Sequence, residues 1–280
     1  MTVLSVRHLN KTYPAFKLED VSFTLEPGKI TGFIGRNGAG KSTTLNSLFN
    51  FVHPDSGEIS FFGMDFAGHE LEIKQRIGFV SSGVNYYANK KLKTISRVTS
   101  SFYNNWDQAA YEKYLAMFHL DENKTPAQLS AGMKVKFALA LALSHNADLL
   151  ILDEPTSGLD PVSREDLLEV FMDLCAQGKT ILFSTHITSD LDKCADNIIY
   201  IKNGRLIADC SVSDFEQSYR IASFDSAEAM REYQGISRGQ RRTRKGCTAL
   251  ISAADAQTPG LKLSPADLES IMIHIEKEAE

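Results

Sequence analysis

The chain has 280 residues, of which 43% are hydrophobic and 23% are charged, and its formal net charge is −5. This is the composition of an ordinary globular protein, and the length allows one large domain with a small appendage. The acidic balance excludes the broad basic surface that a nucleic-acid-binding protein carries.

The cysteines and the apolar runs narrow the class of protein further. Cys175, Cys194, Cys210 and Cys247 are scattered, and none stands at metal-ligand spacing, as expected of reduced packing residues in a cytosolic protein. No apolar run reaches the roughly 18 residues of a membrane span, and the first residues lack the apolar segment of a signal peptide. If the protein works at a membrane, we expect another chain to cross it.

The first part of the chain predicts an antiparallel start followed by mixed strands and helices. Alternating or wholly apolar residues predict strands, and a 3.6-residue period predicts a helix. The expected strands are Val3–Leu9, Val21–Leu25, Lys29–Ile34, Glu58–Phe62 and Arg76–Val80, and the expected helix is Ser42–Phe51.

From about residue 88 to residue 145 the pattern predicts a helical insertion. It is polar and aromatic at first, and it closes with a long helix that begins near Ser130. A strand at Asp148–Leu152 follows that is apolar after its first residue, and such a strand is typical of the buried centre of a parallel sheet. Asp160 and Pro161 then predict the start of a helix, and Gly178 predicts its end.

The last part of the chain is less informative. A strand at Lys179–Ser184 and a hairpin around Asn203 and Gly204 complete a parallel-sheet α/β core. After residue 211 we expect a short helix, a basic cluster at Arg238–Lys245 and a final helix at Pro265–Glu278. The basic cluster fits a solvated loop, or a contact for acidic lipid headgroups or an acidic partner.

The segment GRNGAGKST between an expected strand and an expected helix fits the phosphate-binding pattern G-x-x-x-x-G-K-[ST]. Glycines let successive backbone N–H groups point at phosphate oxygens, and the helix adds its positive end. Lys41 would contact the β and γ phosphates, and Ser42 would offer a hydroxyl to Mg²⁺. The expected nucleotide-binding residues of this loop are Gly35, Arg36, Asn37, Gly38, Ala39, Gly40, Lys41, Ser42 and Thr43.

Two adjacent carboxylates follow the buried strand at residues 148–152. Asp153 stands at the strand end and suits Mg²⁺, which it would hold through water. Glu154 is placed to polarise the attacking water as a general base. These residues, with the phosphate loop, predict a nucleotide triphosphatase.

The order of the segments GRNGAGKST, LSAGM, LLILDEP, SGLD and STH over residues 1 to about 210 resembles the nucleotide-binding subunit of an ATP-binding cassette (ABC) transporter. The resemblance implies an α/β P-loop NTPase core with a mixed, largely parallel sheet. It also implies an N-terminal antiparallel β subdomain and a helical insertion, with residues 211–280 as a small accessory region. The overall sequence is most similar to those of bacterial ATPases that serve ABC-2-type exporters.

The resemblance also implies roles for single residues. Tyr13 matches the aromatic residue that stacks on adenine, and Asp153 and Glu154 match the Mg²⁺-associated carboxylate and the base. His186 matches the histidine that contacts the γ phosphate. Asp160 ends the SGLD loop, which crosses the dimer interface in the family.

The segment LSAGM matches the family signature, usually LSGGQ, whose Ser and second Gly bind the γ phosphate of the opposite subunit. Ser130 and Gly132 retain these two positions, whereas Ala131 and Met133 depart from the pattern. The family usually has a Gln near Mg²⁺ where Ser82 stands here. The resemblance implies a homodimer, or a heterodimer with a second ABC ATPase subunit, that holds two ATP molecules between its chains.

The function implied is that of a peripheral ATPase subunit, with ATP and Mg²⁺ bound, at the cytoplasmic face of the membrane. ATP-driven dimer closure would drive a separate membrane permease, as in exporters, and no nucleic-acid partner is expected. Two alternatives stay open: a soluble ABC ATPase acting on nucleic acid or ribosomes, and a regulatory module with an inactive site.

Overall fold

The computed structural model describes residues 2–81, 87–244 and 246–278. The chain divides into two compact units. The first comprises residues 1–186 and 194–209, and the second comprises residues 187–193 and 210–280.

The first unit begins with an antiparallel sheet of strand order β2-β1-β4-β5. The first two strands are longer than the alternation of apolar and polar residues predicts. The β1–β2 pairing shifts register between Val6 and Lys11, and this shift interrupts the alternation. His8 and Asp20 have positive φ angles of 51° and 52° there, which interrupts the period of two. The strands are β1 (Leu4–Tyr13), β2 (Phe16–Leu25), β4 (Ser56–Phe61) and β5 (Met64–Asp65).

The second sheet has six strands in the order β10-β9-β3-β8-β7-β6. The pairs β3–β8, β3–β9, β7–β8 and β6–β7 are parallel, and β9 and β10 form the hairpin expected around Asn203 and Gly204. This arrangement confirms the expected α/β class. The strands are β3 (Ile30–Ile34), β6 (Ile77–Ser81), β7 (Leu149–Asp153), β8 (Thr180–Thr185), β9 (Asn197–Lys202) and β10 (Arg205–Ser211).

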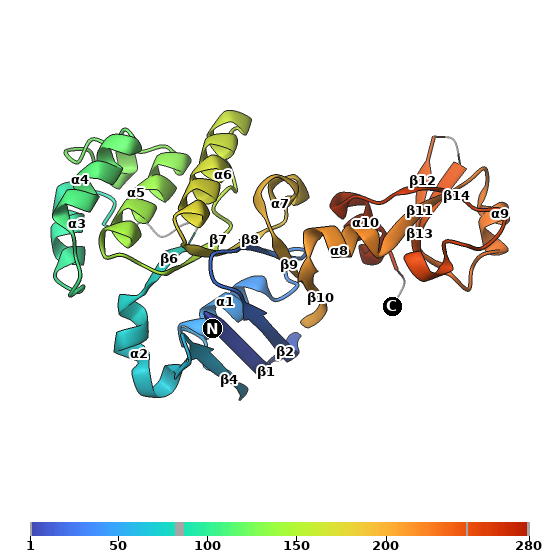
Figure 1. Cartoon of the computed structure of the whole chain (residues 1–280), viewed down its shortest axis with the longest axis horizontal. Coiled ribbons are helices and arrows are strands. Elements are labelled where there is room, and N and C mark those ends of the chain that lie inside the picture. The colour runs from blue at the N-terminus through green and yellow to red at the C-terminus, as the bar shows by residue number, and fades with distance from the viewer. Residues whose placement is uncertain (1, 82–86, 245, 279–280) are drawn as a thin grey trace. The chain divides into compact units, whose positions relative to one another are not determined.

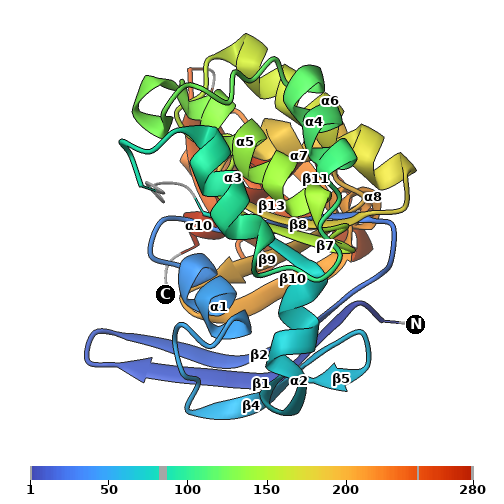
Figure 2. The same ribbon diagram turned by 90° about the vertical axis from the view of Figure 1, so that its left-hand side faces the viewer.

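Helix α1 (Lys41–Leu48) lies between the two sheets, as Figure 2 shows. Its Leu45 and Leu48 are fully buried in one apolar cluster that also contains Phe23 of β2 and Ile151 of β7. Burial of such side chains contributes about 1.5–3 kcal/mol each. The phosphate loop therefore precedes a helix that is fixed on both sides.

The helices α3, α4 and α5 lie together at one side of the first unit (Figure 1). Buried Tyr111 of α4 and Phe137 of α5 contribute to their packing. Helix α2 is one that the sequence pattern did not predict, because its apolar residues show little helical periodicity. The helices are α2 (Phe66–Gln75), α3 (Leu92–Ser100), α4 (Gln108–Met117), η1 (Pro126–Gln128), α5 (Ala131–Ser144) and α6 (Pro161–Ala176).

The second unit contains a four-stranded sheet of order β12-β13-β11-β14, which the sequence did not predict. The expectation of a loop is wrong for residues 238–243, which lie in the edge strand β12, whereas Arg244 lies in a turn and Lys245 lies outside the described residues. The elements are α7 (Thr188–Cys194), α8 (Val212–Gln217), β11 (Tyr219–Phe224), α9 (Ala227–Arg231), β12 (Ser237–Thr243), β13 (Gly246–Ser252), η2 (Ala253–Asp255), β14 (Lys262–Pro265) and α10 (Leu268–Glu276).

Candidate functional site

The loop between β3 and α1 needs its glycines for two different reasons. Gly38 has a φ of +83°, a left-handed conformation that a side chain disfavours. A Cβ on Gly35 would lie 2.4 Å from the backbone oxygen of Ile201, so only glycine fits against β9. The loop therefore holds its backbone close to the sheet while its middle stays exposed.

Lys41 is the buried cation of this loop, with only 5% of its surface exposed. Its Nζ donates to the carbonyl oxygen of Gly35 at 2.7 Å and lies 3.4 Å from Oε1 of Glu154. The N-cap of α1 is Gly40, which has no side chain to cap the helix. The first N–H groups of α1 are thus free of a side-chain cap and suited to phosphate oxygens.

A hollow of about 580 Å³ lies beside this loop. This volume is within the range of about 300–1,000 Å³ that is usual for small-molecule sites. Most of the loop residues that the sequence predicts to bind nucleotide line this hollow, and Glu154 and His186 line it as well. Its lining residues are Ala15, Phe16, Arg36, Asn37, Gly38, Gly40, Lys41, Ser42, Thr43, Glu154, Ser157 and His186.

Glu154 is held by contacts on several sides. Its Oε2 lies 2.8 Å from Nδ1 of His186, and its backbone N–H donates to Oγ of Ser184 at 2.9 Å. Its φ of +51° is a conformation that costs a non-glycine residue about 1–3 kcal/mol. An ionised carboxylate only accepts, so this contact places the His186 proton on Nδ1 in the neutral ring. These contacts hold Glu154 at the hollow in spite of the free-energy cost of its positive φ.

The oxygen groups near the hollow fit Mg²⁺, which prefers oxygen ligands and usually keeps several from substrate phosphates and water. Ser42 lines the hollow in the first turn of α1. Asp153 accepts a hydrogen bond from Ser184 through Oδ1, and its Oδ2 takes none from the described residues. No group of three or more His, Cys, Asp or Glu side chains among the described residues could hold a metal by itself. A magnesium ion here would depend on the nucleotide.

The residues expected from the signature and from the SGLD loop lie at the N-terminal ends of α5 and α6. Ser130 caps α5 by accepting from the N–H of Met133, and a Cβ on Gly132 would lie 3.5 Å from Leu159. Asp160 caps α6, and the hydroxyl and backbone N–H of Ser163 hold the pKa of its carboxyl below the usual value. Ser130, Gly132 and Asp160 do not line the hollow of their own chain.

The expected stacking of Tyr13 on adenine stays a prediction. Tyr13 ends β1, its side chain is partly exposed, and it does not line the hollow; its ring centroid is 6.4 Å from that of Phe16. Phe16 lines the hollow instead, because the tight turn between β1 and β2 directs it toward the loop, and a Cβ on Gly40 would lie 3.0 Å from its ring. Sequence reasoning missed Phe16, although it lies in the same segment, NKTYPAF.

Ser82, where the family usually has Gln, lies outside the described residues. Ala131 and Met133 lie in the first turn of α5, at its exposed and partly buried positions. Neither departure disturbs the cap at Ser130.

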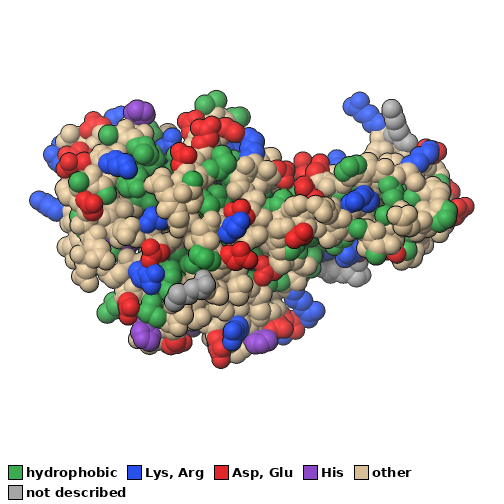
Figure 3. Space-filling view, viewed as in Figure 1, with side chains coloured by type: hydrophobic (Ala, Val, Ile, Leu, Met, Phe, Trp, Pro, Cys, Tyr) green, Lys and Arg blue, Asp and Glu red, His purple; other side chains and the backbone are tan. Residues whose placement is uncertain are grey.

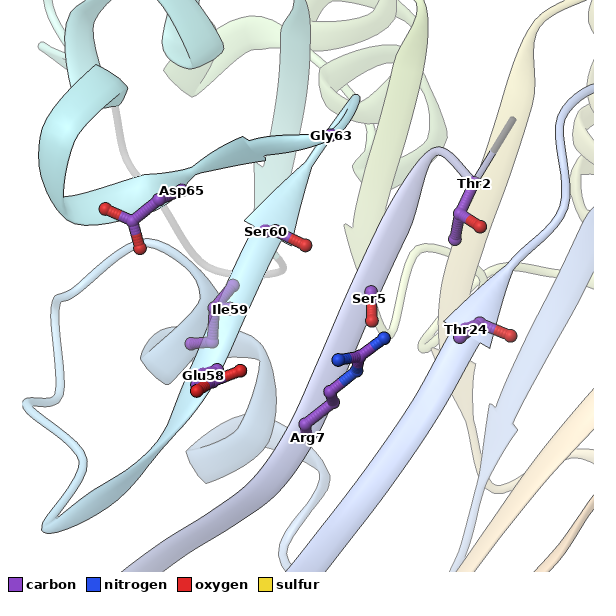
Figure 4. Close-up of a pocket in the computed structure, with 9 residues that line it drawn as sticks. All are labelled: Thr2, Ser5, Arg7, Thr24, Glu58, Ile59, Ser60, Gly63 and Asp65. Atoms are coloured by element: carbon purple, nitrogen blue, oxygen red, sulfur yellow. The ribbon is translucent and has the colours of Figure 1, made fainter.

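A second hollow, of about 560 Å³, lies on the outer face of the antiparallel sheet (Figure 4). Ser5 of β1 is paired with Thr24 of β2 and with Ser60 of β4, and Arg7 is paired with Glu58. None of the nucleotide-binding residues expected from the sequence lines this hollow, so the candidate site is the hollow beside the phosphate loop.

Within residues 2–81, 87–244 and 246–278, no helix is both long and apolar enough to cross a membrane.

Comparisons with known proteins agree with this geometry. A family model described as "ABC transporter" matches residues 18–157. The Nod factor export ATP-binding protein I of Burkholderia lata is 39% identical over 194 residues, which cover 68% of this chain and 64% of that protein. The bacitracin transport ATP-binding protein BcrA of Bacillus licheniformis is 33% identical over 210 residues, which cover 74% of this chain and 69% of that protein. The matches thus span about two thirds of the relatives' own length.

A solved structure shows the same arrangement. The ATP binding subunit of an ABC transporter matches with a TM-score of 0.70 and 32% identity, over 77% of this chain and 92% of that one.

Proposed function

This chain belongs to the ABC transporter family of ATP-binding proteins, and on that premise we propose that it binds and hydrolyses ATP in the hollow beside the phosphate loop. One observation carries the proposal. The buried cation Lys41, the carboxylate of Glu154 and the ring of His186 form one chain of contacts at the wall of a hollow lined by the loop.

The contacts of Lys41 suggest the first step. Its ammonium group contacts the Gly35 carbonyl and Glu154. A triphosphate in the hollow offers stronger anionic acceptors, so Lys41 would turn to the phosphates and release Glu154. The carboxylate, still oriented by His186, could then accept a proton from the attacking water. Bound Mg²⁺ would neutralise charge on the phosphates, with Ser42 and Asp153 to hold it.

A second chain is needed to complete the site, and the surroundings of Gly132 support this. Glycine in a helix is about 0.5–1 kcal/mol worse than alanine. A Cβ here would meet Leu159 and Ser163 only at ordinary distances of 3.5 and 3.8 Å. The fold of this chain therefore gives no steric reason for glycine. We infer that the reason is the γ phosphate bound by a second copy, or by a related subunit.

An exposed aromatic surface supports a membrane permease as the further partner. Phe51 is 63% exposed and Phe102 is 70% exposed. Lys74 lies over the ring of Phe51, and Gln75 donates to the backbone carbonyl oxygen of Phe102, so both residues border the end of α2. The names of the relatives favour export, and the chain would then act at the cytoplasmic side of the membrane.

The two alternatives have less support. Lys, Arg, Asp and Glu side chains are interspersed over the face seen in Figure 3, without the continuous basic surface that nucleic acid requires. The intact contact between Glu154 and His186 argues against an inactive regulatory module.

The proposal is tested by phosphate release and ATP binding. The wild-type chain should hydrolyse ATP, and Lys41→Ala should lose ATP binding. Glu154→Gln should bind ATP but hydrolyse it about 10²–10⁴-fold more slowly, the usual share of a general base. Glu72→Gln removes one charge at an exposed position of α2 and serves as the control. Unchanged turnover of Glu154→Gln would show that another group is the base.

The partner is tested separately. The chain should co-purify from membranes with a multi-span protein, and Phe51→Ser with Phe102→Ser should weaken that association without changing ATP binding. Recovery only in the soluble fraction, with no membrane partner, would contradict the transport role.

A further inference from the structure

Ser184 lies beside the two carboxylates and has no role in the chemistry described above. It is the next-to-last residue of β8, is fully buried, and is paired with Asp153 in the parallel register of β7 and β8. Its Oγ donates to Oδ1 of Asp153 at 2.6 Å. The same Oγ accepts the backbone N–H of Glu154 at 2.9 Å.

These two hydrogen bonds use the hydroxyl in both of its capacities. A serine hydroxyl has one proton to donate, and here that proton goes to Asp153. The hydroxyl oxygen also accepts the backbone N–H of Glu154, whose φ of +51° is unfavourable without such support. One buried atom therefore fixes the carboxylate suited to the metal and the backbone of the base together.

We propose that Ser184 is a positioning residue for the ATP hydrolysis proposed above: it sets the orientation of Asp153 toward the nucleotide-bound metal and the position of Glu154 toward the attacking water. It touches neither substrate nor metal. Its effect reaches the reaction through the two carboxylates, so its loss should slow turnover without weakening the contacts that the phosphate loop makes with ATP.

The same strand supplies a matched control. Thr180 begins β8, is 2% exposed, and accepts the backbone N–H of Gly28 through Oγ1 at 3.0 Å. It resembles Ser184 in burial and in holding one backbone N–H, but it lies at the opposite end of the strand from Glu154. Thr180→Val therefore reports what the loss of a buried β8 hydroxyl costs in stability alone.

The test compares Ser184→Ala and Ser184→Cys with the wild type and with Thr180→Val. The cysteine keeps nearly the same volume but is a weak hydrogen-bonding group, so it separates packing from hydrogen bonding. We expect kcat for ATP to fall roughly ten- to hundredfold in both Ser184 variants, with KM within about twofold. Thr180→Val should keep the wild-type kcat even if it unfolds at a lower temperature.

A second readout does not depend on turnover. The Mg²⁺ concentration for half-maximal binding of a fluorescent ADP analogue should rise about tenfold in the Ser184 variants, as it does when a group that orients a metal-binding carboxylate is lost. Analogue binding without Mg²⁺ should be unchanged. The Mg²⁺ titration also applies if Ser184→Ala folds poorly, because Ser184→Cys preserves the packing.

The outcomes separate the two proposals. A wild-type chain that releases no phosphate would overturn the proposed function, and the Mg²⁺ titration would still decide the role of Ser184. An active wild type with unchanged kcat and unchanged Mg²⁺ dependence in both Ser184 variants would overturn the positioning role. An equal loss of kcat in Thr180→Val would also overturn it, because the effect would then be one of strand stability.

Discussion

Substitution of Gly132 separates the fold of this chain from assembly with a second one. A Cβ at this position would lie 3.5 Å from Leu159 and 3.8 Å from Ser163, at ordinary contact distances. Gly132→Ala should therefore fold without strain and gain up to about 1 kcal/mol in stability, because alanine is the better helix former. Gly132→Asp places a carboxylate in the first turn of α5, where the helix N-terminus contributes about 0.3–1 kcal/mol and offsets part of the cost of charge at this buried position.

The assembled state should respond in the opposite way. In an ATP-bound dimer the new carboxylate of Gly132→Asp would face the γ phosphate held by the other chain. Two like charges about 4 Å apart repel by about 4 kcal/mol at an effective dielectric constant of 20. Both sites of a homodimer carry the substitution, so the repulsion sums to about 8 kcal/mol, which corresponds to a roughly millionfold weaker ATP-dependent association.

The assay is sedimentation of Glu154→Gln with and without ATP, alone and combined with Gly132→Asp. Glu154→Gln should dimerise with ATP, and the double variant should stay monomeric while it remains folded. ATP should still bind to the monomer, because Gly132 does not line the hollow of its own chain. Normal dimerisation of the double variant, or a chain that does not fold, would refute the reasoning.

Two further predictions concern stability. Burial lowers the pKa of His145, which stacks on Tyr103, to about 4, so the unfolded chain binds the proton more readily between pH 4 and 6.5. The free energy of unfolding should therefore fall by about 3 kcal/mol as the pH drops through this window, and urea unfolding of His145→Gln should lack that part of the pH dependence; equal slopes in the two proteins would contradict it. Arg238 donates to both carboxylate oxygens of Glu278, so Arg238→Lys should lose about 1 kcal/mol, because lysine cannot form the paired bonds. Urea unfolding should show this difference shrinking in 1 M salt, and a difference independent of salt would indicate lost packing instead.

Local sequence was sufficient where the structure depends on local geometry. The phosphate loop, the cap of α6 by Asp160 and the turn at Asn203–Gly204 each follow from residues within a few positions of one another. The parallel core was likewise predictable, because strands such as Leu149–Asp153 are apolar throughout and followed by carboxylates. Such features form from local residues and do not depend on where the segment lies in the fold.

Features that depend on distant pairing were not predictable. In the second unit β11 pairs with β13 and β14, and β12 carries arginines where a half-buried strand would alternate, so no periodic signal marks this sheet. The bond between Ser184 and Asp153 joins residues 31 positions apart. The choice of Phe16 over Tyr13 at the hollow depends on the turn between β1 and β2, which composition does not determine.

The central proposal, a nucleotide site shared by two chains, is tested most directly by mixing two inactive variants. Lys41→Ala damages the phosphate loop and Gly132→Asp the signature, so each variant alone should be inactive in both of its shared sites. A mixed dimer would have one site built from the intact loop of one chain and the intact signature of the other. Because neither variant should pair with itself on ATP, mixed dimers with one intact site of two predict up to about half of the wild-type rate of phosphate release. A mixture no more active than its separate components would contradict a site shared between two copies of this chain.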